Sequence, residues 1–140
     1  MAVAYAYGHA AVHLLTKDVS WSGDVIQAGL FSSSYTPDVD NHEFVSDLSG
    51  EVTDASYTRH TLTSTTVTYS ATNNGAICGS DQLQWNTLTG TFRYVIFFKW
   101  TGSASTSALL SYIDYGGDQT VTASNWPVPL PTNGYLMLQV

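Results

Sequence analysis

Two histidines near the start of the chain, His9 and His13, have the spacing that places two imidazoles on one face of a helix. Imidazole nitrogens at this spacing can bind zinc when a further ligand completes the site. No glutamate lies between the histidines, Gly8 weakens the helix, and the neighbouring residues are small and apolar. We therefore expect a packed pair of histidines and no metal site.

The densest group of oxygen ligands lies at Asp38, Asp40, Asn41 and Glu43, and its start resembles a calcium-binding loop. The EF-hand pattern then fails, because Glu43 stands where that pattern has glycine, and a serine stands where it has its last, bidentate glutamate. These acids are predicted to form a solvated loop that caps a short helix.

Nucleophilic catalysis needs a serine or cysteine on a constrained turn, a histidine base and an acid that orients the base. The sequence contains neither a G-x-S-x-G elbow nor a cysteine-protease signature. Cys78 stands among small residues, which is typical of a small buried hydrophobic residue. Asp114 lies between tyrosines, which is typical of a glycosidase carboxylate in an aromatic cleft, but it precedes Gly116 and is predicted to cap a turn. We expect no catalytic residue, no cofactor and no enzymatic activity.

Composition sets further limits on the class of protein. A length of 140 residues with 44% hydrophobic residues suits one domain over residues 1–140. The net charge is −7 and only four residues are basic, which argues against binding to nucleic acid or to an anionic membrane surface. The single cysteine cannot form an internal disulfide, and the first charge, Lys17, follows the apolar start, unlike in a signal peptide. We expect a soluble protein that is made in the cytoplasm.

The elements that hold these residues are predicted to be mainly strands, because the dominant hydrophobic period is two. Val67 and Tyr69 lie on one face of a β-branched run that stops at the turn signal Asn74-Gly75, which predicts a hairpin. A short helix is expected over residues 4–15, and one further helical turn near Phe44. Six to eight strands are expected, over runs that include residues 24–31, 60–72, 92–100, 109–116, 119–124 and 135–140. The predicted fold is an antiparallel β-sandwich, jelly-roll or immunoglobulin-like, with a short N-terminal helix.

The run RYVIFFKW, residues 93–100, has large apolar side chains on both faces of its predicted strand. Tyr94, Ile96, Phe98 and Trp100 share one face, which is expected to lie in the core. The other face is apolar at its centre and charged at its ends. Either the N-terminal helix or a partner chain is expected to cover that centre.

Several segments resemble small structural proteins of tailed bacteriophages. They are the SSSYTPD turn with its short acidic helix, a tryptophan before the TFRYVIFF strand, the YIDYG strand and the closing NGYLMLQV. The resemblance covers nearly the whole chain, but it departs at YTRHTLTSTTV and at the proline-rich NWPVPLPTNGYL. It implies a compact β-sandwich that is a component of the virion.

Two functions follow as expectations from this resemblance. The first is a capsid decoration or cement protein that binds the major capsid protein in many copies, as a trimer. The alternative is a tail or tail-fibre component that binds a host-surface glycan or another tail protein through exposed aromatic residues. The candidate contact residues are Val95, Phe97, Trp100 and Trp126.

Overall fold

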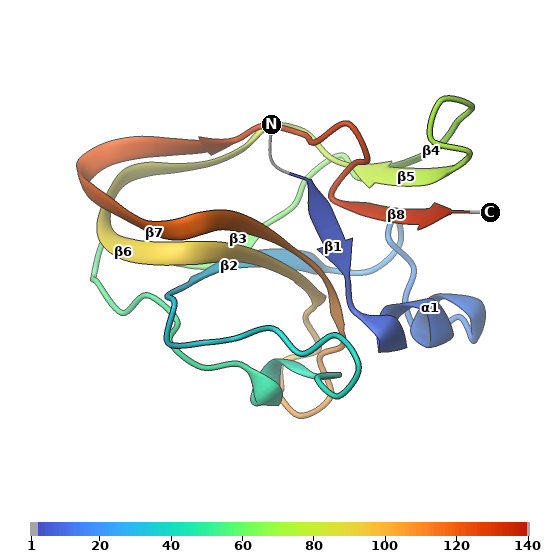
Figure 1. Ribbon diagram of the computed structural model, residues 1–140, viewed down its shortest axis with the longest axis horizontal. Coiled ribbons are helices and arrows are strands. Elements are labelled where there is room, and N and C mark those ends of the chain that lie inside the picture. The colour runs from blue at the N-terminus through green and yellow to red at the C-terminus, as the bar shows by residue number, and fades with distance from the viewer. Residues whose placement is uncertain (1–2, 140) are drawn as a thin grey trace.

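A computed structural model describes residues 3–139 and shows a β-sandwich of two antiparallel sheets with one short N-terminal helix (Figure 1). The larger sheet has the strand order β1-β7-β6-β2-β3, and the smaller has the order β4-β5-β8. The elements are β1 (Ala4–Ala6), α1 (Gly8–Leu15), β2 (Ile26–Phe31), a 3-10 helix η1 (Val45–Asp47), β3 (His60–Thr61), β4 (Thr66–Ser70), β5 (Gly75–Gly79), β6 (Leu83–Lys99), β7 (Leu109–Val128) and β8 (Leu136–Gln139). The predicted mainly β fold is confirmed.

The aromatic strand is central to the larger sheet, as predicted, because β6 lies between β7 and β2. It is longer than expected and begins at Leu83. The runs predicted at 109–116 and 119–124 form one continuous strand, β7, instead of two. The ladder shifts register between Phe92 and Tyr94 of β6, and Gly116 of β7 has a φ of 82° in this region. Glycine adopts this conformation without steric cost, so the strand accommodates an irregularity there and does not end.

The ribbon of β6 and β7 curls so that its far half returns over the larger sheet (Figure 1). Two further irregularities bend it, at Thr87 and Ala123, which both have positive φ angles. Leu83 and Leu88 of the far half are fully buried against the larger sheet's inner face. The returning ribbon and the smaller sheet therefore form the second layer of the sandwich.

The start of the chain corrects the helix predicted over residues 4–15. Ala4–Ala6 form β1, which pairs with β7, and the helix begins only at Gly8. The backbone N–H of Tyr7 donates to Leu110, and its ring is buried. Pairing with the edge of β7 satisfies backbone groups that a frayed helical start would leave open. The hairpin of β4 and β5 and the helical turn at η1 lie where they were predicted.

Both faces of the aromatic strand are buried inside this chain. Val95 and Phe97 are fully buried in the main core, where the Phe97 ring stacks on Tyr135 at 4.7 Å. Ile96 and Phe98 are equally buried in a second cluster on the opposite face of the sheet, beneath the 32–52 segment. The sandwich thus has one core between its layers and a smaller apolar cluster outside the larger sheet.

Candidate functional site

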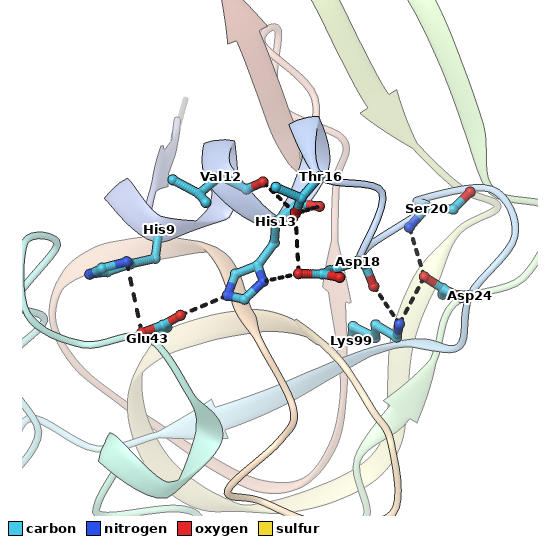
Figure 2. Close-up of polar contacts among 9 residues, drawn as sticks. All are labelled: His9, Val12, His13, Thr16, Asp18, Ser20, Asp24, Glu43 and Lys99. Atoms are coloured by element: carbon cyan, nitrogen blue, oxygen red, sulfur yellow. Dashed lines mark hydrogen bonds and ion pairs between the residues drawn. The ribbon is translucent and has the colours of Figure 1, made fainter.

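A group of ionisable side chains connects α1 to the segment that precedes η1 (Figure 2). His13 Nε2 lies 2.9 Å from Oε1 of Glu43, and His13 Nδ1 lies 3.5 Å from Oδ2 of Asp18. His9 Nδ1 approaches the other oxygen of Glu43 at 3.8 Å. The i, i+4 spacing therefore places both histidines on one helix face, as predicted, and Glu43 lies opposite them.

Lys99 extends this group on the far side of Asp18. Its ammonium lies 3.3 Å from the carboxylate of Asp24 and also donates to the backbone carbonyl of Asp18. The Asp24 carboxylate in turn accepts a hydrogen bond from the backbone N–H of Ser20. These contacts connect α1, the turn that follows it and the end of the central strand.

A hollow of about 300 Å³ adjoins the group; it is lined by His13, Asp18, Val19, Phe44, Lys99, Ser105, Thr106 and Ala108. The polar side chains that line it already have partners: both nitrogens of His13 face carboxylates, and Lys99 faces Asp24 outside the hollow. Neither nitrogen of His13 is directed at a serine or threonine hydroxyl. The geometry suits a charged connection between segments more than a base that activates a nucleophile.

Glu43 lies beside the two histidines as a third polar group, and this neighbour was not predicted from the sequence. Its two oxygens point at different rings, and one of them is in direct hydrogen-bond contact with His13. A metal ion bound by both residues would have to lie between His13 Nε2 and the Glu43 carboxylate, where the direct hydrogen bond leaves no room for it. Among residues 3–139, no group of three His, Cys, Asp or Glu side chains is arranged to hold a metal ion.

The acids of the 38–43 segment do not converge on one point. The Asp38 carboxylate accepts hydrogen bonds from the backbone N–H groups of Asp40 and Asn41 and from the Asn41 amide. The Asn41 side chain, followed by its backbone N–H, lowers the pKa of Asp38 below its usual value. Glu43 faces α1 instead. The predicted loop is present as a turn capped by Asp38, but the predicted cap of the short helix is wrong, because Asp47 of η1 itself accepts hydrogen bonds from the backbone N–H groups of Glu43 and Phe44.

Asp114 forms a bidentate ion pair with Arg93 across the β6–β7 ladder, with N–O distances of 2.8 and 3.1 Å. It also accepts a hydrogen bond from the backbone N–H of Gly116. These bonds, with Arg93 first, lower the pKa of Asp114. Asp114 therefore supports the irregularity at Gly116, although within a continuous strand and not at the strand end that was predicted.

Cys78 lies in β5 and is 7% exposed in the main core. Burial raises the pKa of its thiol to about 11. It is thus protonated at neutral pH, and the thiolate is the reactive form of cysteine. This agrees with its interpretation as a small buried hydrophobic residue.

The four candidate contact residues are not brought together on one surface. Val95 and Phe97 are fully buried in the core of this chain, so the expectation that a partner chain covers them is wrong. Trp100, just beyond β6, is half-buried, and the Arg59 guanidinium lies 4.7 Å from its ring centroid. Trp126 lies at the opposite end of the ribbon, where it is half-buried and donates to the Tyr115 hydroxyl.

A second polar group, absent from the sequence predictions, covers the end of the larger sheet. Arg59 pairs bidentately with Glu51, which also accepts a hydrogen bond from Tyr57. Burial, followed by the nearby Glu51 charge, raises the pKa of Tyr57. The only available signal was the spacing of opposite charges eight positions apart, within a loop that has no regular period.

Comparisons with protein-family models, with curated proteins and with solved structures found no match to this chain. Within residues 3–139, no helix is long and apolar enough to cross a membrane.

Proposed function

We propose that this protein is a non-enzymatic structural component of a tailed-bacteriophage particle, and that it acts as a capsid decoration protein bound in many copies to the major capsid protein. The observation that supports this best is that ionisable side chains connect separate segments of the chain. His13 with Glu43, Arg59 with Glu51 and Arg93 with Asp114 each join separate segments of the chain. Such polar contacts between segments suit a rigid scaffold that presents a surface.

The central strand supports the same proposal. Its apolar side chains fill two clusters, one on each face of the larger sheet. A core on both faces makes the central sheet resistant to local opening, because each opening exposes apolar area to water. A decoration protein that stiffens a shell needs this resistance.

The second candidate, a tail component that binds a host-surface glycan, depends on a half-exposed aromatic ring. One face of Trp100 is occupied by Arg59, so this ring has only its other face for stacking on a sugar. Trp126 packs edge to face against Phe92 and Tyr115 and is also half-buried. We therefore place this candidate second, with Trp126 as its contact residue.

Copy number separates the two candidates. Virions are purified from a lysate of a host that carries the phage encoding this chain, and the chain is quantified against the major capsid protein by mass spectrometry with labelled peptides. Hundreds of copies per particle are expected for a decoration protein, whereas a few to a few dozen would favour the tail candidate. Absence from purified particles would overturn both.

A further inference from the structure

The smaller sheet carries no charged side chain, although the net charge of the chain is −7. Residues 61–80, which include β4 and β5, contain no Asp, Glu, Lys or Arg, and neither do residues 119–140, which include β8. All of the charge therefore lies on other segments. Two copies of this chain repel each other through those segments, but not through this sheet.

β4 and β8 are the two edges of this sheet, and β4 lacks the features that normally prevent edge pairing. It pairs with β5 in unbroken register over Thr66–Ser70, with no proline, lysine or bulge. No backbone hydrogen bond from elsewhere in residues 3–139 reaches these residues. β4 lies at the outer margin of the molecule (Figure 1). Other edges are shorter, as in β1, β3 and the four-residue β8, or irregular, as in the far half of β7.

The β4 sequence is complementary to itself when two copies run antiparallel. If Thr68 lies opposite its own copy, Val67 lies opposite Tyr69, and Thr66 lies opposite Ser70. An aromatic side chain opposite a β-branched one, and one hydroxyl side chain opposite another, are favourable cross-strand pairs. Val67 and Tyr69 are 50% and 67% exposed in the single chain, so this pairing buries apolar surface that is now in water.

We propose that two copies of this protein associate through β4, edge to edge, about a two-fold axis that passes beside Thr68. Each three-stranded sheet then continues into the other, and the free backbone groups of both edges form a shared ladder. The occupant of the edge is a second copy, because the strand complements itself and the sheet around it is neutral. This inference is independent of the proposed place in a virion.

The two-fold axis makes a direct test possible, because a substitution at Thr68 places two copies of the new side chain opposite each other at the centre of the interface. Thr68→Lys places two ammonium groups opposite each other and should raise the dimer dissociation constant about tenfold or more. The same change brings the net charge closer to zero, so general repulsion between the chains cannot explain a weaker dimer. Thr122→Lys, at an exposed position of β7, is the matched control and should leave the dimer intact.

Analytical ultracentrifugation of the purified full chain, over dilutions from millimolar to micromolar, measures each dissociation constant, and circular dichroism checks that each variant is folded. Thr68→Glu should weaken the dimer to a similar extent, and an equimolar mixture of the Lys and Glu variants should dimerise more tightly than either variant alone. This rescue keeps the test decisive even if either variant is less stable. A monomeric wild type, a Thr68→Lys variant that dimerises like wild type, or a mixture that dimerises no more tightly than either variant alone would overturn the proposal.

Discussion

At the residue scale, the pair of Arg93 and Asp114 links stability to pH. Because the pKa of Asp114 is lower in the folded chain than its usual 3.8, the pair contributes fully above that value. The contribution is lost as the pH falls through the lower, folded value. We expect Asp114→Asn to lower the urea midpoint at pH 7 and to flatten the fall of stability below about pH 4.

Arg93→Gln provides the matched comparison for this pair, because it removes the same bonds from the other side. Its urea midpoint should fall in the same direction, and the double variant should be less destabilised than the sum of the two single changes. Additive losses, or an Asp114→Asn variant with the wild-type acid slope, would show that the pair does not carry this pH dependence.

The contact between His13 and Glu43 gives a second expectation at this scale. The His13 ring and the Glu43 carboxylate are hydrogen-bonded to each other and not held apart around a metal ion. We therefore expect chelation by EDTA to leave the melting temperature unchanged. Glu43→Gln should cost about 1 kcal/mol of unfolding free energy, with and without EDTA alike, because a charge-assisted hydrogen bond is lost. A melting temperature that falls by several degrees on chelation of the wild type alone would indicate a bound metal.

At the element scale, a substitution in the central strand distinguishes a core role of Phe97 from a role in an interface. Because its ring is fully buried against Tyr135, Phe97→Ala should cost about 3–5 kcal/mol and lower the melting temperature by ~10 °C or more. Val25→Ala, at a side chain that is 50% exposed, should change stability by only about 0.5 kcal/mol. If Phe97→Ala instead kept its melting temperature and lost self-association, the ring would belong to an interface.

At the scale of the whole molecule, the partition of charge predicts an unusual response to salt. The proposed dimer has no ion pair at its β4 contact, while the remaining surface of each copy is acidic. Salt screens that repulsion, so raising sodium chloride should strengthen the dimer. Sedimentation at low and high salt measures this directly. Weakening by salt would point to an interface built from ion pairs elsewhere on the surface.

Much of the local structure could be predicted from the sequence, because strands and turns depend on nearby residues. The period of two around Val95 predicted the central strand, and Asn74-Gly75 predicted the hairpin of β4 and β5. The spacing of His9 and His13 predicted their shared helix face. Each of these patterns is complete within a few positions of the chain.

Only the tertiary structure decided what covers each apolar face and which charges meet. Phe97 is apolar in any environment, but its burial depends on Tyr135, which directly precedes β8 and lies 38 positions away in the sequence. Likewise, Glu43 meets His13 across a separation of 30 positions. Such contacts form when chain segments are packed together, and no local period records which segments will meet. The free edge of β4 combines both levels, since its sequence sets what it can pair with and the fold leaves it open.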